Sequence, residues 1–264
     1  MAKKKRVTTT SRSERSPSVM VAQPKPARSW AEFLEQIRAA REDLGKPDTV
    51  WYRGHSRANY KLTPSLLRNP QWLQKEKVLF HEYERSANQI LDEQSSDWNL
   101  LINMQHYGIP TRLLDWTDIL GVALAFALYD SLDDDEDSVV YVLDPIKLNS
   151  ESGLREIKRV PNDRKFDYKA CYWEGRPFKP AYPIAIDTPF KNNRIAAQKG
   201  SFTIHGANHA AIEDQAPAST RRILIPSAIK PAAREFLDYA DLNPFSIYPD
   251  IVGMAQHIVR KHLK

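Results

Sequence analysis

Residues 105–117, QHYGIPTRLLDWT, hold most of the side chains in this chain that could do chemistry. They supply an amide, an imidazole, a phenol, hydroxyls, a guanidinium and a carboxylate in one short segment. A histidine oriented by a carboxylate is a common general base, so His106 and Asp115 could form such a pair. The structural alternative is that Asp115 or Thr117 caps the following helix and that His106 is a buried, hydrogen-bonded group. The segment alone does not decide between the two.

A second candidate is Arg53, in the segment WYRGH at residues 51–55. This segment is typical of a buried strand, and a guanidinium at its end could hold a phosphate or carboxylate through two parallel hydrogen bonds. The alternative is a structural ion pair. Gly54 would let a ligand or another part of the backbone come close, or would make a turn.

Metal binding and several common enzyme classes are disfavoured. His205 and His209 are four residues apart, but Gly206 between them spoils the helical spacing of a zinc site. The single cysteine, Cys171, has no thiolate partner, so we expect no metal. The chain also lacks a P-loop, a dinucleotide-binding glycine motif and a nucleophile elbow.

Helix and strand signals along the chain predict one α+β domain over residues 29–264, with a mixed, mostly antiparallel sheet and flanking helices. Helices are expected over 29–43, 72–94, 98–107, 118–132, 231–240 and 249–263, and strands over 49–55, 111–117, 138–145, 194–205 and 220–229. A long irregular segment is expected over 149–183, with an internal helix as the alternative.

Alternation along the predicted strand 111–117 places Thr111, Asp115 and Thr117 on one face and Arg112 on the other. Arg112 and Asp115 should therefore not pair. A carboxylate flanked by Leu114 and Trp116 is costly to bury alone, so Asp115 needs a partner. The candidates are His106, Arg53 and a helix N-terminus.

The net charge of +5 is concentrated in one segment. Residues 1–28 carry eight basic residues and one acidic residue, so the rest of the chain is slightly acidic. This basic segment has few large apolar residues and is expected to be a disordered tail that could contact nucleic acid, act as a nuclear-import signal, or only aid solubility. No apolar run is long enough to span a membrane, and we expect a cytoplasmic protein.

The segments WYRGH, LLINMQHYGIPTRLLDWTDILGVALAFAL, RIAAQKGSFTIHG and YPDIVGMAQHI together resemble the FRG-domain family, over roughly residues 30–262. The family takes its name from a Phe-Arg-Gly motif, and Tyr52 stands here in place of the Phe. The central segment QHYGIPTRLLDWT is highly specific. The biochemistry of this family is poorly defined, so the resemblance implies no particular reaction.

A more distant resemblance is to ADP-ribosyltransferase folds, in which an Arg at a strand end holds the phosphates of NAD. Arg53 with Gly54 matches that strand end, Thr111 or Thr117 a following hydroxyl, ALAFA at 123–127 a buried helix, and ILIP at 223–226 a late strand. Gln198 stands where this family has its catalytic Glu. Either Glu213, Asp214 or Asp115 takes its place, or the site binds without transfer.

Taken together, these resemblances imply a nucleotide-binding pocket and, as the first hypothesis, an NAD-consuming enzyme with a toxin or antiviral (phage-defence) role. The nucleotide would contact Arg53, Gly54, Gln105, Tyr107, Thr111 and Arg112, and the reaction would use His106, Asp115 and Gln198. The second hypothesis is a non-catalytic module that binds a nucleotide or an RNA end. The third is a metal-dependent hydrolase that uses His106 and Asp115.

Overall fold

The computed structural model of the protein describes residues 25–87, 96–129, 135–162, 165–189 and 193–263. Most of the predicted basic tail, residues 1–24, lies outside the described residues. Residues 25–28 lie against the first helix, α1 (Trp30–Asp43), where the Gln36 side chain donates to the Lys25 carbonyl. Ser29 caps this helix by accepting from the Glu32 amide.

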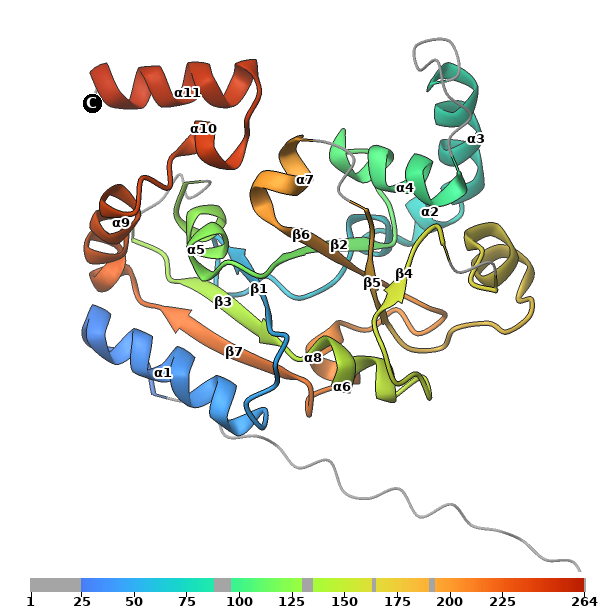
Figure 1. Ribbon diagram of the computed structural model, residues 1–264, viewed down its shortest axis with the longest axis horizontal. Coiled ribbons are helices and arrows are strands. Elements are labelled where there is room, and N and C mark those ends of the chain that lie inside the picture. Colours follow the sequence, from blue (N-terminus) through green and yellow to red (C-terminus); the bar gives the residue numbers. More distant parts are fainter. Residues whose placement is uncertain (1–24, 88–95, 130–134, 163–164, 190–192, 264) are drawn as a thin grey trace, which may run out of the picture.

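The described strands form one seven-stranded sheet in the order β4-β5-β6-β2-β1-β3-β7 (Figure 1). Every pairing is antiparallel except that of β4 with β5, which confirms the predicted mixed, mostly antiparallel sheet. The strands are β1 (Trp51–His55), β2 (Leu113–Thr117), β3 (Ser138–Leu143), β4 (Lys158–Arg159), β5 (Ile184–Asp187), β6 (Gly200–Ile204) and β7 (Thr220–Ile225).

Two separate hydrophobic cores cover one face of the sheet. In the first, α1, α5 (Leu120–Tyr129) and α9 (Lys230–Tyr239) pack on β1, β3 and β7. In the second, α3 (Glu76–Ala87), α4 (Asp97–His106) and a π-helical turn at Lys169–Glu174 pack on β2, β5 and β6. These two groups of helices lie towards opposite ends of the sheet in Figure 1.

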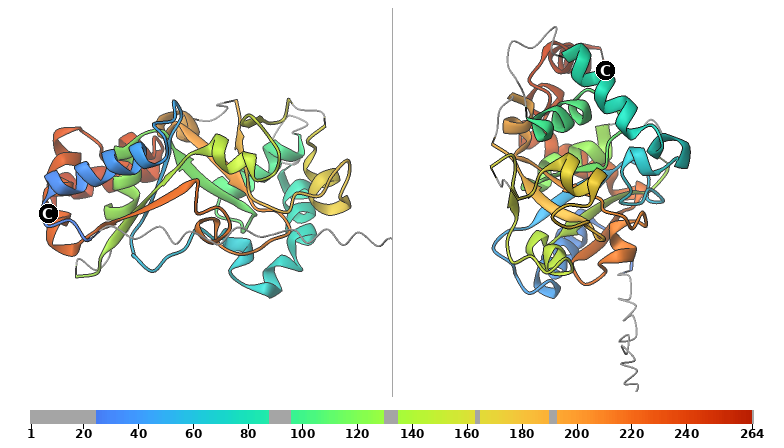
Figure 2. Two further views of the ribbon diagram at one scale, coloured as in Figure 1. Left: turned by 90° about the horizontal axis from the view of Figure 1, so that it is seen from below. Right: turned by 90° about the vertical axis from the view of Figure 1, so that its right-hand side faces the viewer.

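The other face of the sheet packs on a third core, which includes α6 (Pro145–Ser150) and α8 (Ile212–Gln215). Helices therefore flank the sheet on both sides, as the two further views show (Figure 2). The remaining short helices are η1 (Ser65–Leu67), α2 (Pro70–Leu73), α7 (Asn193–Gln198), η3 (Ser227–Ile229) and α10 (Pro244–Ile247), and the last helix is α11 (Ile251–His262). No helix of the described chain is both long and apolar enough to cross a membrane.

Two sequence predictions need correction. The helix expected over 72–94 is divided into α2 and α3, and residues 88–95 lie outside the described residues. The strand expected over 194–205 begins only at Gly200, because the preceding residues form α7. The alternation of apolar residues does not reveal that the two sides of Gly200 differ in structure.

Candidate functional site

The sheet opens between β1 and β2, its two central strands. Only Tyr52 and Thr117 are paired in this ladder, whereas β1 pairs along its whole length with β3. Beyond Tyr52 the strands diverge, and the side chain of Arg53 enters the gap. Its Nη1 donates to the Asp115 carbonyl over 2.5 Å. The Arg53 side chain therefore supplies the hydrogen bond that β1 does not give to this backbone oxygen of β2.

A cavity of about 290 Å³ lies over this opening, between the two cores that share the face. It is bounded by β1, β2 and the start of β6, and by α4, α5 and α7. Arg53, His106, Asp115 and Gln198, which come from four separate segments, all line it. Of the other nucleotide-contacting candidates, Gly54 and Gln105 line it too. Its volume is at the small end of the range for ligand pockets.

Arg53 is held from both sides. Besides its bond to Asp115, its Nε donates to the Nε2 of His55 over 2.9 Å. The other ring nitrogen of His55 lies 3.3 Å from the Tyr60 carbonyl, so this imidazole is neutral with its proton on Nδ1. The Nη2 group of Arg53 makes no hydrogen bond to the described residues, and it is left to donate to a ligand.

Asp115 is held by an amide, not by the histidine. Gln105 Nε2 donates to its Oδ2 over 2.7 Å, and Arg53 Nη1 lies 3.6 Å from the same oxygen. Gln105 is itself oriented by the Thr111 hydroxyl, which donates to Gln105 Oε1 over 2.6 Å. Of the partners proposed for Asp115, Arg53 is present and His106 makes no hydrogen bond to it within the described part of the chain.

His106 nevertheless faces the cavity. Partial burial lowers the pKa of its imidazole, and the positive charge of Arg194 lowers it further, while Asp250 and Asp115 oppose this. The imidazole is therefore neutral at neutral pH and could accept a proton. Its ring also packs edge-on against Tyr107, with 4.8 Å between the ring centroids.

The cavity is positively charged. Among the described residues, three arginines line it, Arg53 from β1, Arg68 from the segment after η1 and Arg194 from α7, whereas Asp115 is the only described carboxylate that does so. Arg53 and Arg68 are close enough that the charge of Arg68 lowers the pKa of Arg53, behind the larger effect of burial. Like charges held this close favour an anion between them.

Gln198 joins the cavity to the C-terminal segment. Its side-chain amide donates to the Ile247 carbonyl over 3.1 Å, and its backbone carbonyl accepts from the Thr117 hydroxyl over 2.5 Å. Thr117 also accepts from the Ile119 amide, in the turn that precedes α5. Since α5 begins at Leu120, this bond does not reach the first turn of the helix, and the carboxylate of Asp115 faces the cavity.

Three of the expected nucleotide contacts do not line the cavity. Tyr107 is 71% exposed on the surface, and Thr111 is buried beneath Gln105. Arg112 forms a buried ion pair with Glu76 through two hydrogen bonds, one of them 2.8 Å long, and also donates to the Gly206 carbonyl. Arg112 therefore joins α3 to β2 and the segment after β6, and has no donors directed at the cavity.

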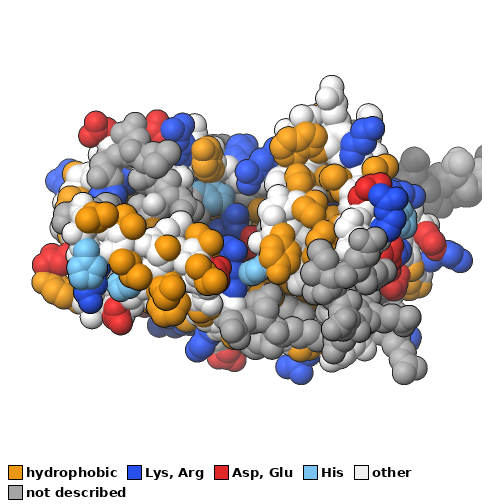
Figure 3. Space-filling model, turned by 90° about the horizontal axis from the view of Figure 1, so that it is seen from above, with side chains coloured by type: hydrophobic (Ala, Val, Ile, Leu, Met, Phe, Trp, Pro, Cys, Tyr) orange, Lys and Arg blue, Asp and Glu red, His pale blue; other side chains and the backbone are white. Residues whose placement is uncertain are grey.

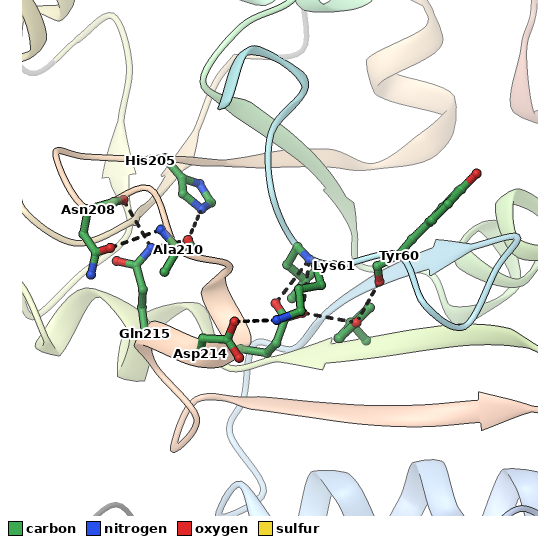
Figure 4. A network of polar contacts seen from close by, with 10 residues as sticks. Tyr60, Lys61, His205, Asn208, Ala210, Asp214 and Gln215 are labelled. Carbon is green, nitrogen blue, oxygen red and sulfur yellow. Dashed lines mark hydrogen bonds and ion pairs between the residues drawn. The ribbon is translucent and has the colours of Figure 1, made fainter. Parts of the chain in front are cut away.

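Two of the three carboxylates considered as replacements for the missing Glu, Glu213 and Asp214, lie outside the cavity. Glu213 accepts from the Leu62 amide, and Asp214 forms an ion pair with Lys61 over 2.9 Å (Figure 4). His205 bonds the Ala210 carbonyl in the same region, and no group of three or more metal-ligating side chains is found among the residues that were placed. Of the carboxylates in the described part of the chain, Asp115 is thus the one that lines the cavity.

The residues of this cavity that sequence reasoning missed include His55, Tyr60, Arg68 and Arg194. His55 is two positions after Arg53 on the same strand, so the alternation of the strand could have assigned it to the same face. Arg68 lies in a segment without a motif, and Arg194 is the first residue of the segment RIAAQKGSFTIHG, whose resemblance to the FRG family assigns this arginine no role. Only the folded chain brings them to Arg53.

Two buried neutral histidines predict a loss of stability in mild acid. Burial, with a further contribution from Arg53, lowers the pKa of His55 to about 3, and burial lowers that of His205 to about 3. The unfolded chain takes up these two protons near its ordinary pKa, and the folded chain does not. Between about pH 7.5 and about pH 5.5 we expect the free energy of unfolding to fall by roughly 1.4 kcal/mol for each histidine.

Urea unfolding at the two pH values measures this fall, and nitrogen NMR of the folded protein provides the control. Both imidazoles should stay neutral at the lower pH. A free energy of unfolding that is constant over this range, or a protonated His55 in the folded protein, would contradict the hydrogen bonding described for Arg53.

Comparison with known proteins gives one match. Residues 48–136 match the family model of the FRG domain, which confirms the resemblance noted in the sequence for this part of the chain. They include β1, α4, β2 and α5, and with them Arg53, Arg68, His106 and Asp115. No curated protein and no solved structure matches the chain.

Proposed function

We propose that the cavity binds the diphosphate of a nucleotide, with NAD as the ligand. The part of the chain that matches the FRG domain includes β1 and β2, the two strands that border the opening in the sheet. The observation that carries the proposal is the excess of three arginines over one carboxylate around the cavity. A diphosphate offers several acceptor oxygens to guanidinium donors, and partial burial strengthens such bonds. Arg53 is the anchor, because its Nε and Nη1 are already fixed by His55 and Asp115.

The proposed reaction is the cleavage of the bond between nicotinamide and ribose. As this bond breaks, nicotinamide leaves with the bonding electron pair and the ribose acquires positive charge. Asp115, the one carboxylate among the described lining residues, stabilises that charge. His106 takes the proton from the attacking hydroxyl or water, and Gln198 donates to a ribose oxygen. With water as acceptor, the products are ADP-ribose, nicotinamide and a proton. Such a reaction would suit a toxin or antiviral effector.

A second candidate function is binding without turnover. It is favoured by the engagement of Asp115 with both Gln105 and Arg53, which already occupy part of the carboxylate, and by the neutral amide at Gln198. In this case the cavity holds a nucleotide or the phosphorylated end of an RNA, and the basic tail at residues 1–28 adds attraction to nucleic acid.

One experiment separates these functions. The full chain is titrated with NAD in a calorimeter and, separately, incubated with NAD while released nicotinamide is measured by chromatography. Turnover by the wild type that is lost in Asp115→Asn, with binding retained, supports the enzyme. The asparagine keeps one oxygen for Gln105 and removes the negative charge.

The other results are equally informative. Binding of NAD without release of nicotinamide, with candidate protein and nucleic-acid acceptors present, supports the binding module. Neither binding nor release rejects NAD as the ligand. Hydrolysis of a phosphate ester that stops on addition of EDTA supports a metal-dependent hydrolase instead.

A further inference from the structure

The last helix, α11, carries its apolar face on the outside of the molecule. Its outward side chains include Ile251 at 80% exposure, Val252 at 64%, Ile258 at 50% and Val259 at 53%. The helical repeat places these four residues and Ala255 on one face. Figure 3 shows hydrophobic side chains gathered at the end of the molecule where α11 lies in Figure 1.

The opposite face of α11, which contacts the body of the protein, is not apolar. Gly253 is its one buried residue, and a Cβ there would come within 2.0 Å of the Tyr248 carbonyl oxygen. Arg260 stacks over the Tyr129 ring, with 3.9 Å between the guanidinium carbon and the ring centroid. The usual orientation of a surface helix is thus reversed. A continuous apolar surface of this kind marks a contact site.

The charges at the two ends of α11 indicate what covers this face. Asp250 caps the N-terminus, and the last turn carries Lys261 and His262 in addition to the body-facing Arg260. A second α11 laid antiparallel would bring the acidic end of each helix to the basic end of the other and would oppose the two helix dipoles. An anionic lipid surface would fit only the basic end. The charge pattern of α11 is therefore complementary to itself.

We propose that α11 pairs antiparallel with the α11 of a second copy of this chain, around a two-fold axis at Ala255. In this register Ile251 faces Val259 of the other copy, and Val252 faces Ile258. A small residue on the axis lets the two helices approach closely, and such a self-complementary contact closes into a dimer. The proposal does not depend on what the cavity binds.

The oligomeric state of the full chain tests the proposal. Light scattering coupled to size exclusion should give twice the chain mass of 30.3 kDa. Ile258→Lys places a charge in the contact and should convert the protein to a monomer. Val78→Lys is the matched control, since Val78 is 55% exposed on α3 and should leave the dimer intact. A wild type that is monomeric at high micromolar concentration, or a dimer that survives Ile258→Lys, overturns the proposal.

The register has its own test. Ala255→Cys should form an intermolecular disulfide on mild oxidation with diamide, because the two copies of this residue meet at the axis. Gln256→Cys, one position further along α11, should not. The native Cys171 is buried and provides no competing thiol. Equal cross-linking of both variants rejects this register, and binding of the monomer to phosphatidylserine vesicles would assign the face to a membrane surface instead.

Discussion

Arg53→Ala is expected to lower the affinity of the protein for NAD by about 100-fold or more. Two charge-assisted hydrogen bonds to phosphate, at about 1.5 kcal/mol each as a lower value, amount to about 3 kcal/mol. Arg53→Lys should also lose about 10-fold, because an ammonium cannot keep the His55 and Asp115 contacts while it donates twice to a ligand. Calorimetric titration of the variants with NAD measures both effects.

The control must separate lost binding from lost structure, because Arg53 also satisfies the Asp115 carbonyl. Arg68→Ala serves this purpose: Arg68 lines the same cavity, lies exposed, and bonds within the described residues only to the Thr63 carbonyl. We expect it to keep the stability of the wild type and to lose about 10-fold in affinity, one charge-assisted bond. Wild-type affinity in Arg53→Lys would show that the guanidinium is structural.

Local patterns were sufficient for the elements that carry the site. The helices expected over 98–107 and 118–132 correspond to α4 and α5, because helical patterns act within a few residues of the chain. Alternation placed Arg112 and Asp115 on opposite faces, and the structure has Arg112 paired with Glu76 and Asp115 at the cavity. These features depend on backbone geometry, which neighbouring residues determine.

What could not be predicted depends on pairings between distant segments. β1 and β2 are paired only at Tyr52 and Thr117, and the sheet is open beyond this pair. No residue type in either strand predicts this opening. Arg112 donates its hydrogen bonds to Glu76 and so is not free to contact a ligand. The sequence suggested a ligand contact, because Arg112 is an arginine within the segment QHYGIPTRLLDWT. Side-chain chemistry nominates candidates, and long-range packing decides which of them face the cavity.

Gly54 is the clearest case, because the sequence allowed it three roles: approach of a ligand, approach of the backbone, or a turn. The structure has β1 crossing directly beneath α5, and a Cβ added at Gly54 would lie 1.8 Å from the Ala123 carbonyl oxygen and 2.9 Å from the Ala127 amide nitrogen. Both are backbone atoms of a buried helix, so no rotamer change can relieve the overlap. The glycine is required for the close packing of β1 against α5.

Gly54→Ala is therefore expected to cost more than about 3 kcal/mol in the free energy of unfolding, beyond the usual range for an extra methyl group in a core. Gly200→Ala, in β6 at the other side of the cavity, is the matched control: its added Cβ comes no closer than 3.5 Å to Ile195, an ordinary contact. That variant should change stability by less than about 1 kcal/mol. Urea unfolding of both variants measures the difference. If Gly54 served only to admit a ligand, Gly54→Ala would instead fold with the stability of the wild type and lose affinity for NAD alone.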